Sequence, residues 1–135
     1  MIRHHKNQNG FTLLEVLIAL AILSIGLLAL AGLQVVVIKG NTGSKNLSSA
    51  VILAEAKIEE LKKSGFANLV NGNFQDANNP VNETGQAGGI FTRSWAIADY
   101  LGSADMKQIT VTLTWTDSVG DHTISVTTVF SKAVD

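Results

Sequence analysis

The sequence contains no cysteine, one proline and only eight aromatic residues: five Phe, two Trp and one Tyr. Without cysteine the chain can form neither a disulfide nor a thiolate metal site, and it has no cysteine nucleophile. Lys and Arg number 10 and Asp and Glu number 11, so the formal net charge is −1. A net charge so close to zero gives no indication of steering toward nucleic acid, and we expect no nucleic acid partner.

Histidine, the most frequent general base, is also scarce. His4 and His5 lie among the first ten residues, which leaves only His122, beside a predicted hairpin loop. None of the serines lies in a G-x-S-x-G motif. Residues 76–80 (DANNP) superficially resemble a calcium loop but lack the glycine and the terminal glutamate of the EF-hand pattern, so a solvated loop is favoured. We therefore predict that the protein is not an enzyme and needs no metal or cofactor.

What the sequence does contain is one long apolar run. Residues 11–38 include a single charged side chain, Glu15, and at about 1.5 Å per residue they are long enough to cross a bilayer. Arg3 and Lys6 precede the run with no acidic residue among them, so the positive-inside rule predicts a cytoplasmic N-terminus. A carboxylate within such a run is unfavourable and indicates a functional residue.

Three processes could act on this segment. Ordinary signal-peptide cleavage would use Ala29-Leu30-Ala31 before Gly32, but the apolar run is longer than usual for a signal peptide and Glu15 interrupts it. A plain transmembrane anchor accounts for the length and leaves Glu15 unexplained. Cleavage between Gly10 and Phe11 would keep the apolar helix in the product.

The third process is supported by a resemblance to a known family. The segment GFTLLE at residues 10–15, followed by an unbroken apolar stretch, resembles the class III signal of type IV pilins and type II secretion pseudopilins. This resemblance implies that a prepilin peptidase cuts between Gly10 and Phe11 and methylates the amino group of Phe11. It also implies residence in the bacterial inner membrane, with the C-terminal domain periplasmic, and then in a pilus or pilus-like fibre with other major and minor pilins.

Glu15 then has a physical role as a subunit assembly contact. Cleavage would expose the α-amino group of Phe11, which is mostly charged at neutral pH because its reference pKa is about 7.7–8.0. Two unit charges about 4 Å apart attract by roughly 4 kcal/mol at an effective dielectric constant near 20. Since an unpaired carboxylate in apolar surroundings is costly, Glu15 would penalise subunits that dock out of register.

The remainder of the chain predicts a small α+β domain. Gly40-Asn41-Thr42-Gly43 indicates a weak point between two helical halves of one long helix at about 12–64. After it, an apolar stripe with polar residues between its members predicts an amphipathic helix over 44–64. The stripe consists of Leu47, Ala50, Val51, Ala54, Ile58 and Leu61.

Residues 65–89, rich in Asn and Gly, predict a long loop. Period-two alternation then predicts three strands at about 90–99, 107–116 and 122–131, the last two joined by a hairpin loop at 117–121. Trp95 and Trp115 are interpreted as core or sheet-face residues rather than a binding platform. The expected fold is pilin-like α+β, with the C-terminal half of the long helix packed on a small antiparallel sheet.

The predicted domains are a leader at 1–10, a transmembrane and polymerisation helix at 11–39 and a globular domain at 40–135. Residues 21–34 further resemble the type IV pilus modification proteins (PilV), a group of minor pilins. That resemblance implies a low-copy subunit that primes pilus assembly or modifies the fibre. A minor pseudopilin of a type II secretion system is the alternative. A second is a single-span anchored binding domain that does not polymerise, which would keep residues 1–10 and need no Glu15.

Overall fold

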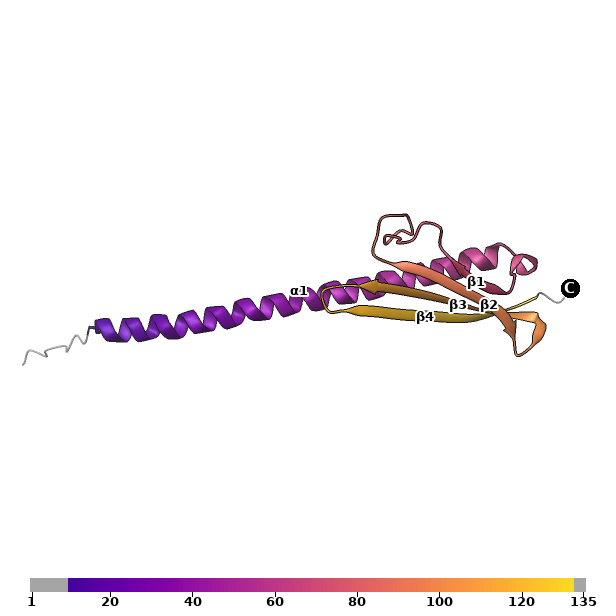
Figure 1. The fold of residues 1–135 in the computed structure, drawn as a ribbon. Helices are drawn as coiled ribbons and strands as arrows, with labels where there is room; N and C mark the ends of the chain where they lie inside the picture. Colours follow the sequence, from indigo (N-terminus) through magenta and orange to yellow (C-terminus); the bar gives the residue numbers. More distant parts are fainter. Residues whose placement is uncertain (1–9, 133–135) are drawn as a thin grey trace, which may run out of the picture. The chain divides into compact units, whose positions relative to one another are not determined.

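The computed structural model describes residues 10–132, and the chain divides between Ile38 and Lys39 into two compact units. Helix α1 (Leu13–Lys63) contributes its N-terminal half to the first unit and its C-terminal half to the second, which also holds the β-sheet (Figure 1). The predicted long helix is therefore confirmed to within one residue at each end. The weak point predicted at Gly40 and Gly43 does not interrupt it.

The C-terminal half of α1 buries one face in the core of the sheet domain. The buried residues recur one, three or four positions apart, as expected for one helix face: Asn46, Ala50, Leu53, Ala54, Lys57 and Ile58. The predicted stripe is wrong at Leu47, which is 48% exposed, and it omits three buried residues: Asn46, Leu53 and Lys57. The ammonium group of Lys57 lies 4.1 Å from the ring centroid of Trp95, so its aliphatic stem takes the place of an apolar side chain.

Helix α1 ends where the sequence predicts it. Lys62 and Lys63 lie in the last turn, where cations complement the helix dipole. Gly65 follows with φ +89°, a conformation that other residues rarely adopt. A short 3₁₀ turn, η1 (Phe66–Asn68), then leads into the sheet.

Four antiparallel strands form one sheet in the order β1-β2-β3-β4, which is also their order in the sequence (Figure 1). They are β1 (Gly72–Gln75), β2 (Thr92–Tyr100), β3 (Ser103–Thr116) and β4 (Asp121–Ser131). The last three correspond to the predicted strands. Strand β1 is a correction, because it lies inside the segment predicted as loop. Its four residues, Gly-Asn-Phe-Gln, are too few and too polar to show an alternation pattern, and it forms only by pairing with β2.

The core lies between the sheet and the buried face of α1. On β3 the predicted alternation is confirmed: Ile109, Val111 and Leu113 are fully buried, whereas the threonines between them lie on the opposite face of the sheet. Trp115 is 5% exposed and packs edge-on against Phe91, with ring centroids 5.6 Å apart. Both tryptophans therefore pack as predicted, Trp115 in the core and Trp95 partly buried against it.

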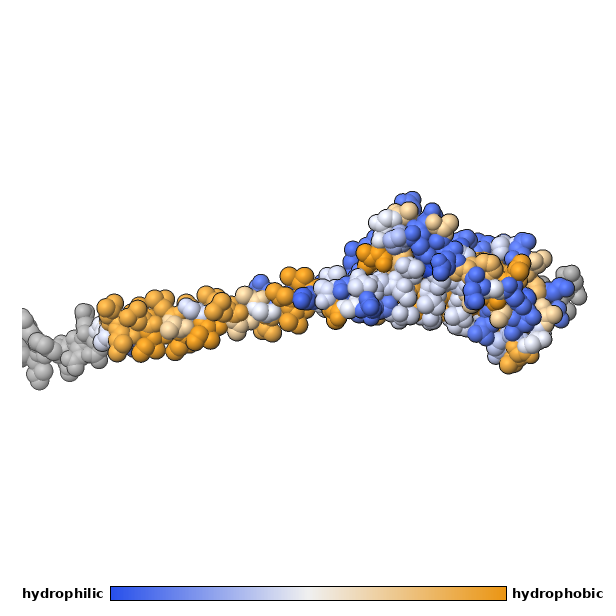
Figure 2. Space-filling model, in the orientation of Figure 1, coloured by the Kyte–Doolittle hydropathy of each residue, from blue (hydrophilic) through white to orange (hydrophobic). Residues whose placement is uncertain are grey.

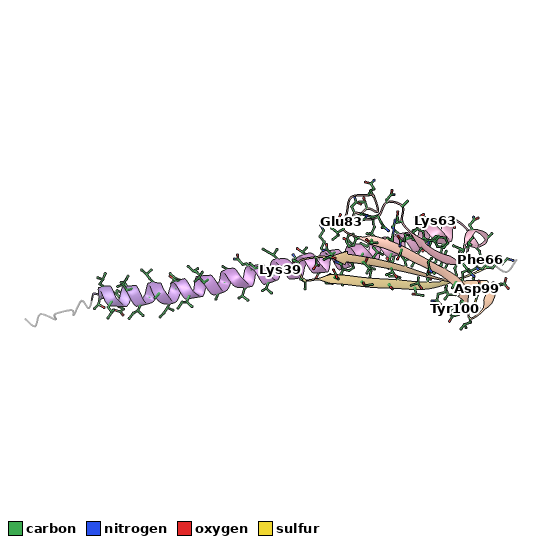
Figure 3. All side chains as sticks on the ribbon, viewed as in Figure 1. Lys39, Lys63, Phe66, Glu83, Asp99 and Tyr100 are labelled. Carbon is green, nitrogen blue, oxygen red and sulfur yellow. The ribbon has the colours of Figure 1, made fainter. Side chains whose placement is uncertain are left out.

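The segment between β1 and β2 is anchored to the domain by backbone pairing. Val81 is fully buried and exchanges two hydrogen bonds with Phe91, at 2.7 and 3.1 Å. Glu83, labelled on this segment in Figure 3, lies 3.7 Å from the ammonium group of Lys45 on α1. The Val81–Phe91 pairing and the Lys45–Glu83 ion pair therefore hold this segment against the rest of the domain.

Candidate functional site at the N-terminal end of helix α1

The peptide bond between Gly10 and Phe11 lies just outside the helix. Both residues are exposed, Phe11 by 82%, and neither belongs to a helix or strand. Gly10 is the only residue of the predicted leader that the structure describes. The rest of the leader, which includes Arg3, His4, His5 and Lys6, lies outside the described residues. An exposed, irregular peptide bond is the kind of backbone that a peptidase can reach.

Thr12 caps the helix that follows. Its hydroxyl oxygen accepts a hydrogen bond from the backbone N–H of Glu15 at 3.2 Å, and its carbonyl oxygen accepts one from Val16 at 3.2 Å. These are the bonds by which an N-cap threonine satisfies the free donors of a first turn. Glu15 itself lies in that first turn, where the helix dipole favours a negative charge.

The carboxylate of Glu15 has no hydrogen bond or ion pair with any residue in the range 10–132. It lies on the same helix face as Ala19, four positions later, and Phe11, which precedes the helix, lies beside them. Together with three neighbours they line a shallow groove of about 460 Å³ on the helix surface. The full set of lining residues is Phe11, Glu15, Val16, Ala19, Leu20 and Leu23. The site therefore combines one unpaired charge with apolar walls.

The rest of this half of α1 is an uncovered apolar surface. Its large side chains are exposed by 45% or more from Val16 to Ile38, and Figure 2 shows apolar groups over most of the visible surface of this segment. By length and composition the helix can span a membrane. From Leu13 to Ile38 it measures about 39 Å at 1.5 Å per residue, more than the roughly 30 Å hydrocarbon core of a bilayer.

The other residues singled out from the sequence do not form a site with these. Asp76 is no solvated loop residue, because its side chain is 9% exposed and accepts hydrogen bonds from Arg93.

His122 stacks on Trp115 with ring centroids 5.1 Å apart, and its Nε2 lies 3.1 Å from Asp117 Oδ1. The pKa of Asp117 lies below its usual value. The main cause is the hydrogen bond that its carboxylate accepts from the Val119 backbone N–H, and the second is its hydrogen bond with His122. Within residues 10–132 no three His, Cys, Asp or Glu side chains are grouped to hold a metal.

A comparison with known families matches the N-terminal segment of the chain. A family model described as the prokaryotic N-terminal methylation motif matches residues 5–31, which include the Gly10–Phe11 junction and Glu15. The chain thus carries the prepilin-type motif of type IV pilin-like and pseudopilin-like proteins, which implies processing by a prepilin peptidase and association with other pilins. Neither the curated proteins nor the solved structures compared with this chain gave a match.

Proposed function

We propose that this protein is a minor pilin of a type IV pilus, of the PilV type, and a structural subunit, not an enzyme. In this proposal the chain is cut between Gly10 and Phe11, methylated at Phe11 and held in the inner membrane by its apolar helix until it enters the fibre. The observation that carries the proposal is the Glu15 carboxylate, which has no partner among residues 10–132 and lies in an apolar groove beside Phe11.

The apolar environment explains why Glu15 selects a partner. Charges within a membrane or an apolar bundle are costly unless they are paired. Cleavage of a neighbouring subunit creates a Phe11 amine, and this amine is a cation that can pair with Glu15. When that amine enters the groove, both charges are compensated, and a subunit displaced along the helix leaves both uncompensated.

The processing step is tested by mass spectrometry of the N-terminus of the protein purified from its membranes. The expected product begins at N-methylated Phe11. A product that retains Met1, or one that begins at Gly32, contradicts the proposal and supports an uncleaved anchor or an ordinary signal peptide.

The assembly step is tested separately with Glu15→Val. We expect this variant to be processed normally and to be lost from assembled fibres, because the partner amine then has no carboxylate to meet. Glu55→Val is the matched control, since Glu55 lies exposed on the same helix but within the sheet domain. Normal incorporation of the Glu15→Val protein contradicts the register role even if processing is confirmed.

The alternative is a minor pseudopilin of a type II secretion system, for which the same N-terminal motif would serve. A deletion strain distinguishes the two functions. Loss of surface fibres with normal enzyme secretion supports the minor pilin, whereas loss of secretion with normal fibres supports the pseudopilin.

A further inference from the structure

Strand β4 forms a long free edge of the sheet. It pairs with β3 alone, from Asp121 opposite Thr116 to Ser131 opposite Met106, without a bulge. The opposite edge is β1, which has only four residues. Short edge strands are protected against pairing with other chains, and long regular ones are not.

The hydrogen bonds at the two ends of the β3–β4 pair define which backbone groups point outward. Asp117 and Gly120 exchange hydrogen bonds across the turn, and the N–H of Lys132 donates to the carbonyl of Asp105 at 2.8 Å. In an antiparallel pair, such bonded positions recur every second residue. The even-numbered residues of β4 therefore bond to β3, and the odd-numbered residues direct their N–H and C=O groups away from the sheet. No described segment forms backbone hydrogen bonds with those outward groups.

The composition of β4 leaves this edge unprotected. Between the charged residues Asp121 and Lys132, residues 122–131 (HTISVTTVFS) contain no Lys, Arg, Asp, Glu, Pro or Gly, the residues that usually block edge pairing. Most are β-branched, which favours strand pairing. The side chains at Thr123, Ser125, Thr127 and Val129 are exposed on the outer face of the sheet, so a second strand can approach without displacing core residues.

We propose that β4 pairs antiparallel with β4 of a second copy of this chain, so that two four-stranded sheets join into one. The charges at the strand ends select this partner and direction. Asp121 begins the strand and Lys132 follows its last residue. Antiparallel pairing brings the Asp121 end of each copy to the Lys132 end of the other, whereas parallel pairing places like charges together.

The odd-numbered residues must lie opposite one another, because only their backbone groups are free to bond. A symmetric pair of the whole strand Asp121–Ser131 is therefore centred on Val126, and Ser125 of each copy lies opposite Thr127 of the other. Opposing residues in such a pair have Cα atoms about 5.5 Å apart, within the range that a disulfide can bridge. This pairing is independent of processing at Gly10, so it can be correct even if the proposed function is not.

Because the chain has no cysteine, single-cysteine variants of the full-length, detergent-solubilised protein test the pairing directly. An equal mixture of Ser125→Cys and Thr127→Cys proteins is expected to yield a disulfide-linked dimer of twice the mass of one chain when oxidised glutathione is added. Thr114→Cys is the matched control, because Thr114 is an exposed threonine on the same sheet face but on the inner strand β3. Equal cross-linking when Thr127→Cys is mixed with Ser125→Cys and when it is mixed with Thr114→Cys, or cross-linking in neither mixture, overturns the proposal.

A second variant identifies the surface that holds the dimer together. Thr127→Lys adds a charge to the edge without touching the core. We expect this variant to keep its fold and to lose the non-covalent dimer, as measured by light scattering. A dimer unaffected by Thr127→Lys associates elsewhere, for example through α1, and contradicts the proposal. Cross-linking of Thr127→Cys in membranes to a protein of different mass would show that another subunit, not a second copy, occupies the edge.

Discussion

Arg93 and Asp76 form an ion pair that the sheet domain almost completely encloses, with each side chain 9% exposed. The Nε and Nη2 groups of Arg93 both donate to Oδ2 of Asp76, the first at 2.9 Å. Its Nη1 group donates to the carbonyl oxygen of Leu53 at 3.3 Å. One guanidinium group therefore joins strand β2 to the segment after β1 and to helix α1.

Breaking this pair from one side should be costly. Arg93→Leu leaves the Asp76 carboxylate buried without its ion-pair partner, and Asp76→Leu does the same to the guanidinium group. We expect each single variant to lower the free energy of unfolding by about 3–5 kcal/mol. The double variant should lose much less unfolding free energy than the two single variants together, because it leaves no unpaired charge. Denaturant unfolding of the four proteins measures this coupling, and additive losses would show that the two charges do not depend on each other.

The same pair makes stability depend on pH in the acid range. Burial raises the pKa of the Asp76 carboxyl group, but the hydrogen bond from Arg93 and that from the Asn78 backbone lower it. The positive charges of Arg93 and Lys57 add to this effect, and the resulting pKa lies below the ordinary 3.8. A carboxyl group with a depressed folded-state pKa stabilises the protein above its unfolded-state pKa and loses that contribution as the pH falls through the folded-state value.

Wild-type stability should therefore fall as the pH decreases below about 4, the region of the unfolded-state pKa. In Asp76→Asn the contribution of this group is absent at every pH, so the acid-dependent loss should be smaller. Unfolding free energies measured at several pH values between about 2.5 and 6 test this, across the range where an Asp pKa of this kind acts. An Asp76→Asn protein with the same pH slope as the wild type would contradict the assignment.

The regular elements could be predicted because each has a periodic pattern. The alternation from Ile109 to Trp115 fixes which face of β3 is buried, and the apolar run with Gly65 after Lys63 fixes the extent of α1. Strand β1 could not be predicted in this way, because Phe74 is its only large apolar residue. That side chain stacks on Trp95 across the strand pair, with ring centroids 6.0 Å apart, a contact between residues 21 positions apart in the sequence.

Arg93 and Lys57 show a different limit. In the sequence Arg93 alternates with Phe91 and Trp95, both apolar, so its position could be expected to be buried, and it is. Its partner could not be predicted, because Asp76 lies in an irregular segment whose path depends on the pairing of β1 with β2. At the N-terminal end the reverse holds: GFTLLE is a local motif, so its residues can be recognised without the fold.

Lys57 is predicted to act on Asp76 through its charge. Its ammonium group is paired with Glu60 at 2.8 Å and lies over Trp95, and its positive charge lowers the pKa of Asp76. Lys57→Met keeps most of the aliphatic stem and removes the charge, so the pKa of Asp76 should rise. NMR titration of the Asp76 carboxyl group measures the change. Lys63→Met, on the exposed part of the same helix, is the control, and an equal rise in both variants would indicate a general effect of net charge.

Gly89 is predicted to tolerate no side chain. A Cβ atom at this position would lie 2.0 Å from the carbonyl oxygen of Val81 and 2.2 Å from the backbone of Asn82, so the backbone itself would have to move. Gly88 is a matched control, because its Cβ would meet nothing within 4 Å although φ is +95°. Gly88→Ala should cost only conformational strain, about 1–2 kcal/mol. Gly89→Ala should cost clearly more and weaken the Val81–Phe91 pairing, which amide hydrogen exchange at Val81 would detect. Equal losses in the two variants would contradict the close approach.

Gly40 and Gly43 lie inside α1, and no packing at either position requires glycine. A Cβ at either position would meet nothing within 4 Å. Glycine in a helix interior costs about 0.5–1 kcal/mol relative to alanine, so Gly40→Ala and Gly43→Ala should each raise the free energy of unfolding by up to that amount. If the uninterrupted helix is the form that assembles, both alanine variants should enter the fibre as well as the wild type does. If they are more stable and yet excluded from the fibre, the glycines serve a helix that must bend or unwind during assembly, and immunodetection of the variants in sheared fibres distinguishes these outcomes.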